Sequence, residues 1–153
     1  MAIERVVATN RKASHLYEIL ETYEAGLVLR GTEVKSLREG HINFKDSYAR
    51  IEGGEAWFVG CHISPYRHGS DANHDPERPR KLLLHQGEIS RLLGKVQERG
   101  LTLVPLRLYF KDGRAKLELG LARGRKLHDK RRAIREREMR REMDKAVRNR
   151  ERG

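Results

Sequence analysis

Histidine and aspartate gather in one stretch of this 153-residue chain, and these are residue types that bind metal ions. Imidazole and carboxylate groups at short spacings can form a zinc site or hold an ion that activates water for hydrolysis. The candidate ligands are His62, His68, Asp71 and His74, with Asp75 next to the last of them. This pattern leaves open a metal-dependent nuclease or hydrolase as an alternative function.

The surroundings of these residues argue against a metal centre. Three of the four prolines lie between residues 64 and 80, together with glycine, serine and asparagine, and this composition is typical of an exposed, mobile loop. Structural zinc sites usually use several cysteines, whereas Cys61 is the single cysteine of the chain. The sequence also has no glycine-rich phosphate loop and no nucleophile with an evident base. We therefore expect a binding protein without metal or cofactor, and not an enzyme.

Positive charge is the second chemical feature, and most of it lies at one end of the chain. There are 33 Lys and Arg against 22 Asp and Glu, which gives a net charge of +11. Residues 123–153 hold 14 of these cations and 6 of these anions, or +8, which leaves +3 for residues 1–122. Such an excess attracts either RNA phosphates or anionic membranes. RNA is the favoured partner, because the basic segment has no aromatic residue to anchor it in a membrane interface.

The sequence also indicates the cellular compartment. The start from Met1 to Arg5 does not have the pattern of a signal peptide, and no apolar run is long enough to span a bilayer. A single cysteine excludes an intrachain disulfide. We expect a cytoplasmic protein with no membrane partner.

Alternating apolar residues and turn signals predict the elements that must position these groups. Two hairpins are expected, one through Gly53-Gly54 and one through Lys111-Asp112-Gly113, and Pro105 implies an edge position or a bulge. Antiparallel hairpins with inserted helices favour a small β-barrel over a parallel sheet, although the count alone does not separate a barrel from a sandwich. The predicted strands are Ile3–Thr9, Tyr17–Leu29, Ser47–Glu52, Glu55–His62, Leu101–Phe110 and Arg114–Leu121.

The long strand at Tyr17–Leu29 should run into a short helix. Its alternation places Glu24 on the face that points away from the core. Gly31 ends the strand, and Thr32 is a candidate N-cap followed by Glu33 in the first turn. A second helix is expected from His85 to Arg99, where apolar residues recur at helical spacing.

The run Leu82-Leu83-Leu84 before the second helix is more apolar than one buried stripe needs, so one of the three leucines is a candidate contact residue on the surface. Another candidate contact is Asn10-Arg11-Lys12, which joins an amide and two cations; a solvated loop is the alternative. The C-terminal segment has too few apolar residues to fold alone. We expect it to be disordered when free and helical on a partner.

Several motifs together resemble the SmpB (small protein B) family, which binds transfer-messenger RNA (tmRNA) during ribosome rescue. The resemblance covers nearly the whole chain in the order of the family. It rests on Glu24-Ala25-Gly26 followed by Gly31-Thr32-Glu33-Val34-Lys35-Ser36-Leu37-Arg38, on Asn10-Arg11-Lys12-Ala13 and Asp46-Ser47-Tyr48-Ala49, and on Arg80-Lys81-Leu82-Leu83-Leu84-His85 and Gly120-Leu121-Ala122-Arg123-Gly124-Arg125-Lys126.

This resemblance implies a fold and a division of the chain. The fold class is an all-β core with helices: a small antiparallel oligonucleotide-binding (OB)-like β-barrel of about six strands with two or three helices, plus a basic C-terminal tail. Residues 1–123 would form the RNA-binding barrel, and residues 124–153 would form the tail, helical on ribosome binding.

The resemblance also implies the function and the partners. The chain would be a tmRNA-binding adaptor for trans-translation, with the barrel on the elbow of the tRNA-like domain. The tail would enter the empty mRNA channel of the stalled ribosome near the decoding centre of 16S rRNA. The complex would include alanyl-tmRNA and elongation factor Tu.

The residues that the resemblance assigns to these contacts fall into two groups. Many relatives have asparagine where this chain has His85, so imidazole hydrogen bonding or stacking would replace an amide contact here. RNA binding is expected of Asn10, Arg11, Lys12, Glu24, Lys81, Leu83, His85, Arg123, Arg125 and Lys126. Contacts of the tail at the decoding centre are expected of Gly124, His128, Asp129, Lys130 and Arg131, with His128 placed to stack on bases.

Overall fold

Nine strands and three helices make up the computed structural model, which describes residues 3–69, 73–124 and 137–143. Residues 137–143 are also helical, and all their side chains are exposed. The helices are α1 (Ala13–Leu16), α2 (Gly31–Arg38) and α3 (Gln86–Arg99). The strands are β1 (Glu4–Thr9), β2 (Tyr17–Leu27), β3 (Ile42–Asn43), β4 (Tyr48–Glu52), β5 (Glu55–Val59), β6 (His62–Ile63), β7 (Arg80–Leu83), β8 (Thr102–Lys111) and β9 (Arg114–Gly124).

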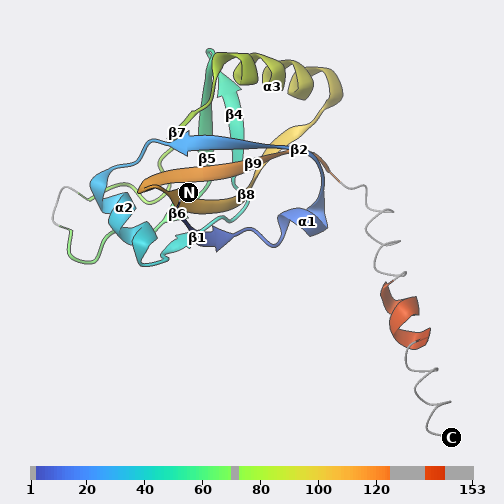
Figure 1. Cartoon of the computed structure of the whole chain (residues 1–153), viewed down its shortest axis with the longest axis horizontal. Coiled ribbons are helices and arrows are strands. Elements are labelled where there is room, and N and C mark those ends of the chain that lie inside the picture. Colours follow the sequence, from blue (N-terminus) through green and yellow to red (C-terminus); the bar gives the residue numbers. More distant parts are fainter. Residues whose placement is uncertain (1–2, 70–72, 125–136, 144–153) are drawn as a thin grey trace, which may run out of the picture.

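The main sheet closes into a ring of antiparallel strands, so the predicted barrel is confirmed. The ring runs β8-β4-β5-β7-β2-β9, and β9 pairs again with β8. The first strand, β1, lies outside the ring against the later half of β8, while the short strands β3 and β6 pair separately. Figure 1 shows β2 and β9 crossing the barrel, with α1 at the start of β2 and α2 beyond its end. Six strands therefore form the closed barrel.

The two predicted hairpins and the bulge are present. Gly53 and Gly54 both have positive φ, 59° and 75°, as a two-residue turn between twisted strands requires. Asp112 and Gly113 form the equivalent turn of the β8–β9 hairpin, with φ of 50° and 79°. The pairing register of β8 with β9 shifts just after Pro105, which is the bulge that a proline within a strand predicts.

Strand β2 has the alternation that its sequence predicts. Ala25 and Leu27 are buried, and Glu24 is exposed between the half-buried Tyr23 and the buried Ala25. The inward side chains of the ring form one main core with Leu92 of the helix α3, and in this core Phe58, Leu92, Leu103, Leu108 and Leu117 are almost fully buried. Burying these side chains supplies the hydrophobic free energy that closes the barrel.

The start of α2 differs from the prediction. Arg30 is the N-cap residue, and Thr32, which was the predicted cap, lies inside the helix. The Glu33 carboxylate accepts a hydrogen bond from the Arg30 backbone N–H at 2.8 Å, as the third helical residue does in a capping box. Thr32 instead bonds the Nδ1 atom of His74 at 2.8 Å, a contact across 42 positions of sequence.

A buried ion cluster joins α2 to β7. Glu33 and Arg80 are both completely buried, and Arg80 Nε donates to Glu33 Oε2 at 2.5 Å. Arg78 pairs with the other oxygen of the same carboxylate. Arg80 also donates to the carbonyls of Cys61 and Pro76, each at 2.8 Å. Because every one of these charges is hydrogen-bonded, the cluster ties the segment before β7 to the helix.

The segment between β6 and β7, whose composition predicts an exposed, mobile loop, is exposed in part and buried at one histidine. Within its described residues, 64–69 and 73–79, the His74 side chain is only 4% exposed. Its Nε2 atom lies 2.8 Å from the carbonyl oxygen of Ile63 and can only donate there. Asn73 bonds the backbone of Tyr66 through both its oxygen and its nitrogen. Tertiary hydrogen bonds therefore fix a segment whose sequence reads as a loop.

Helix α3 carries the predicted apolar stripe and the predicted end. Ile89 and Leu92 are buried, Leu93 and Val96 are half-buried, and Gly100 adopts the left-handed conformation with φ of 61°. Figure 1 shows the helix beyond the upper ends of β4 and β5. None of the helices in the described part of the chain is long and apolar enough to cross a membrane.

Candidate nucleic-acid interface

Glu24 is far in sequence from Leu83 and His85, and the structure brings all three to one groove of about 550 Å³. Glu24 lies on β2, Leu83 ends β7, and His85 is the N-cap residue of α3. Strand pairing brings them together, because Gly26 of β2 lies opposite Leu83 of β7. Residues 113–116 of the β8–β9 hairpin line the groove as well. We call this surface the Glu24 groove.

Gly26 explains why the third residue of the Glu24-Ala25-Gly26 motif is glycine. A Cβ atom at this position would lie 3.2 Å from the Cβ atom of Leu83, closer than ordinary side-chain packing allows. Ala25, which lies between Glu24 and Gly26 in the motif, is completely buried. The motif therefore presents a carboxylate outward, fills the core with a methyl group and leaves room for β7.

The Glu24 carboxylate is held in its ionised form. The Tyr109 hydroxyl donates to Glu24 Oε2 at 2.5 Å, and Lys111 Nζ lies 3.5 Å from the same oxygen. The Tyr109 hydrogen bond and the charges of Lys111 and Lys116 hold the pKa of Glu24 below its ordinary value of 4.5, although partial burial raises it. Burial and the bond to Glu24 raise the pKa of Tyr109, which remains a donor. Glu24 Oε1 has no hydrogen-bond partner within the described residues, so it can accept from a ligand.

Leu83 and His85 add an apolar and an aromatic contact beside this acceptor. Leu83 is 55% exposed, while Leu82 before it is 1% exposed, so one leucine of the run faces outward as predicted. The backbone N–H of His85 donates to Glu88 at 3.1 Å, which fixes the strand-to-helix junction and holds the exposed imidazole at the groove. An acceptor, an apolar patch and an imidazole in one groove can contact the amino group, the face and the edge of an unpaired base.

Cations that the site prediction omitted surround the groove. Arg114 and Lys116 line it, and Lys111 lies next to Glu24. Alternation along β9 places Arg114 and Lys116 on the face opposite Ala115 and Leu117, but only the tertiary structure shows that this face borders Glu24. These side chains can bind phosphates on either side of a base that contacts Glu24.

Lys81 shares the outward face of β7 with Leu83 but does not line the groove. Its Nζ atom lies 3.2 Å from Glu55 Oε1, and its backbone pairs with Trp57 of β5. It is a neighbouring cation.

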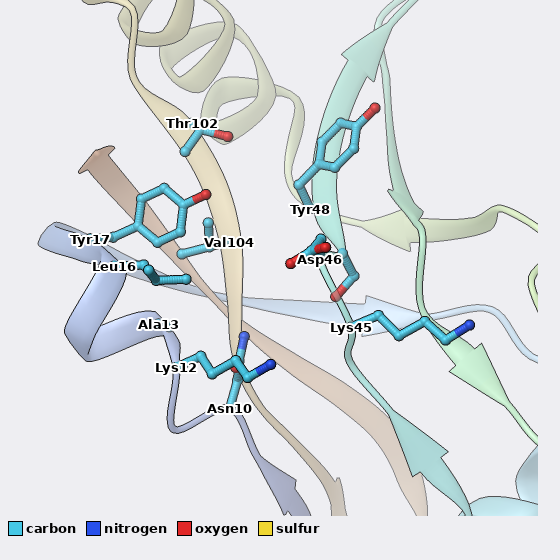
Figure 2. A pocket seen from close by; sticks show the side chains of 11 residues that line it. Asn10, Lys12, Ala13, Leu16, Tyr17, Lys45, Asp46, Tyr48, Thr102 and Val104 are labelled. Carbon is cyan, nitrogen blue, oxygen red and sulfur yellow. The ribbon is translucent and has the colours of Figure 1, made fainter. Parts of the chain in front are cut away.

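The other predicted RNA contacts lie at the opposite end of β2. Asn10 and Lys12 line a second pocket, shown in Figure 2, while Arg11 is exposed beside them. Arg123 is exposed near the end of β9 and pairs with Glu18 at 2.7 Å, and Gly124 is the last residue of that strand. The structure therefore divides the predicted contacts of the barrel between two ends. Arg125, Lys126, His128, Asp129, Lys130 and Arg131 lie outside the described residues.

The described residues of the alternative metal site do not converge on a common point. Both ring nitrogens of His74 make hydrogen bonds within the protein, and His62 faces Glu77 at 3.5 Å. Cys61 is buried, and burial raises the pKa of its thiol to about 12. Asp71 lies outside the described residues, and the described residues contain no group of three or more potential metal ligands.

Comparison with known proteins identifies relatives over nearly the whole chain. An SsrA-binding protein of Desulforudis audaxviator is 63% identical over 145 residues, which cover 95% of each chain. The SsrA-binding protein of Carboxydothermus hydrogenoformans is 59% identical over 97% of this chain and 99% of its own. A solved structure described as "tmRNA-SmpB: a journey to the center of the bacterial ribosome" is 57% identical, with a TM-score of 0.69, over 84% of this chain and 94% of that chain.

The family model of the SmpB protein matches residues 7–149, which is nearly the full length. The family resemblance predicted from the motifs is therefore confirmed. SmpB proteins bind RNA and are not enzymes, which agrees with the absence of catalytic groups noted in the sequence. The chain belongs to the SmpB protein family.

Proposed function

We propose that this chain is the adaptor that binds tmRNA and brings it to stalled ribosomes for trans-translation. The observation that carries the proposal is the convergence of Glu24, Leu83 and His85 on one groove bordered by cations. Relatives about 60% identical over nearly the whole chain are SsrA-binding proteins, and SsrA is another name for tmRNA. The similar solved structure concerns tmRNA, SmpB and the bacterial ribosome.

The Glu24 groove would hold the elbow of the tRNA-like domain. Residues 1–122 have a net charge of only +3, so specific contacts and shape must supply affinity that charge does not. A carboxylate is repelled by phosphates and binds RNA where it accepts from base amino groups. Glu24 would therefore determine specificity, while Arg114 and Lys116 would contribute to affinity.

The tail would contact the ribosome. Residues 123–153 carry a net charge of +8, which suits a channel walled by phosphates. Gly124, Arg125 and Lys126 would lie near the decoding centre of 16S rRNA, and His128 would stack on its bases, followed by Asp129, Lys130 and Arg131. The remaining tail would occupy the mRNA channel, so that mRNA in the channel competes with it. The adaptor would act in the cytoplasm with alanyl-tmRNA and elongation factor Tu.

A substitution at Glu24 tests the RNA site. We expect Glu24→Ala to weaken binding of the tRNA-like domain by about 1–3 kcal/mol, the range for one specific base contact, while the slope of affinity against salt concentration hardly changes. The measurement is a titration of labelled tRNA-like RNA at several salt concentrations, with an unrelated folded RNA as competitor.

Glu52→Ala is the matched control, because Glu52 is an exposed, ion-paired glutamate on β4, outside the groove. It makes the same change in net charge and should leave discrimination intact. If Glu24→Ala protein discriminated against the competitor as well as the wild type, Glu24 would not be a specificity residue.

A further inference from the structure

A second pocket, of about 310 Å³, lies at the far end of the barrel from the Glu24 groove. Strand β2 begins at Tyr17 in this pocket and reaches the groove at Glu24. Strand β8 likewise begins at Thr102 in the pocket and reaches the groove at Phe110. The two sites are therefore separated by most of the length of two strands, and one RNA contact cannot occupy both.

Two tyrosines from different elements form facing walls of this pocket. Figure 2 shows the rings of Tyr17 and Tyr48 on opposite sides, with Val104 between them. Tyr48 is 43% exposed, so part of its surface is open to a ligand. Aromatic rings facing an open pocket are stacking platforms for bases.

A cation at the edge of the pocket fits a nucleotide as well. Figure 2 shows the Lys12 side chain there, whereas the Lys45 side chain extends away from the pocket. Lys45 Nζ pairs with the carboxylate of Glu77. Lys12 can therefore bind a phosphate of a nucleotide held in the pocket.

Ser47 supplies the most specific sign of a ligand. Ser47 lines the pocket and is only 6% exposed. Its hydroxyl has no hydrogen-bond partner within the described residues. A buried polar group without a partner is rare in folded proteins. The backbone of Ser47 is fixed, because Phe44 accepts its N–H bond at 3.0 Å.

We propose that this pocket binds one unstacked nucleotide of an RNA strand. The base lies between Tyr17 and Tyr48, the Ser47 hydroxyl bonds its edge, and Lys12 binds a flanking phosphate. The volume is at the lower end of the range for ligand sites, which suits one nucleotide and not a longer stack.

The position of the pocket favours an RNA strand over a free nucleotide. Gly124, where the described part of β9 ends, pairs with Tyr17 of the pocket wall. The basic segment of the chain thus begins beside the pocket, and an RNA that follows this segment can place a nucleotide there. The inference rests on the proposed function as an RNA adaptor and adds a second RNA contact to it.

Binding of the trinucleotide ApApA to the full chain tests the proposal, measured by chemical shift changes in NMR titrations. We expect the shifts to concentrate on pocket residues, and Tyr17→Leu and Tyr48→Leu each to weaken binding at least about fivefold, the lower limit for loss of one base–aromatic stack. Tyr17→Phe and Tyr48→Phe keep the rings and should bind nearly as the wild type does, which separates stacking from folding defects.

Tyr66→Leu is the matched control, because Tyr66 packs against Lys35 away from the pocket. An equal loss in Tyr66→Leu, or no loss in either pocket variant, would contradict the proposal. Adenosine monophosphate binding as tightly as ApApA would show a free-nucleotide site and would also contradict it. Binding of the tRNA-like domain is measured in parallel: its absence from wild-type protein refutes the adaptor function, whereas the trinucleotide result reports on the pocket alone.

Discussion

A chain that ends at Lys126 is expected to bind the tRNA-like domain nearly as tightly as the full chain and yet to lose ribosome rescue completely. The groove residues Glu24, Leu83 and His85 all precede the cut and lie on the closed barrel. The cut removes most of the basic segment that we propose to enter the mRNA channel. The measurement is peptide transfer to alanyl-tmRNA on ribosomes stalled at the end of a truncated message.

The expected size of this effect follows from charge and length. Residues 129–152 would span roughly 36 Å as a helix at about 1.5 Å per residue, long enough to report whether the channel is empty. Each Lys or Arg that neutralises an rRNA phosphate releases counterions, so many contacts are lost together. The described helix at residues 137–143 leaves Met139 and Met143 60% and 67% exposed, so this part of the tail contributes nothing to the barrel core.

His128→Ala gives a graded comparison for the truncation. It should cause a partial loss of transfer, because stacking on one base contributes about 1–3 kcal/mol. Both variants should keep the affinity of the full chain for the tRNA-like domain, which serves as the internal control. Wild-type transfer rates from the truncated protein would show that the tail does not sense the channel.

Glu33→Ala is expected to lower the free energy of unfolding by about 3–5 kcal/mol, because it leaves the buried guanidinium of Arg80 without its charge partner. Domains of this size are stable by about 5–15 kcal/mol, so the variant should unfold at a much lower denaturant concentration. Glu33→Gln keeps the shape of the side chain and should still be clearly destabilised. Urea unfolding followed by the fluorescence of Trp57 measures the loss.

The matched control is Glu55→Ala, which breaks the exposed pair between Glu55 and Lys81 and should cost about 0–1 kcal/mol. Equal losses in Glu33→Ala and Glu55→Ala would show that the buried cluster contributes no more than a surface pair.

Acid should weaken the same cluster. Burial raises the pKa of Glu33, but hydrogen bonds from Arg78, the Arg30 backbone and Arg80 lower it by more. The pKa of Glu33 is therefore below its ordinary value of 4.5. A carboxylate whose pKa is lowered in the folded state stabilises the fold fully at pH values above its pKa in the unfolded chain. That stabilisation is lost as the pH falls through the folded pKa. Glu33→Gln should therefore unfold with a weaker dependence on pH on the acid side than the wild type.

Local sequence patterns correctly predicted the features that depend on a single strand or turn. Alternation along β2 predicted the outward direction of Glu24, and the pairs Gly53-Gly54 and Asp112-Gly113 predicted both tight turns. The excess of leucine before α3 predicted an exposed contact residue, which is Leu83. These features depend on neighbours within a few residues, which the sequence displays directly.

Long-range contacts explain the failures. Thr32 has the chemistry of an N-cap, but its hydroxyl bonds His74, and Glu33 accepts from the backbone N–H of the N-cap residue Arg30. Strand β7 was missed because it is short and begins with Arg80, a residue that is buried only because Glu33 neutralises it. The approach of the β9 cations to Glu24 depends on the closure of the barrel, which no local pattern encodes.

Photo-crosslinking from position 83 tests the central claim, that the Glu24 groove holds the elbow of the tRNA-like domain. Benzoylphenylalanine replaces Leu83, whose side chain is already exposed, and a matched protein carries it at Arg50 on β4, away from the groove. The crosslinked nucleotides are then mapped by primer extension. We predict crosslinks from position 83 within the elbow and few from position 50. Crosslinks from position 83 to other parts of the RNA, or an equal yield at the elbow from both positions, would contradict the account.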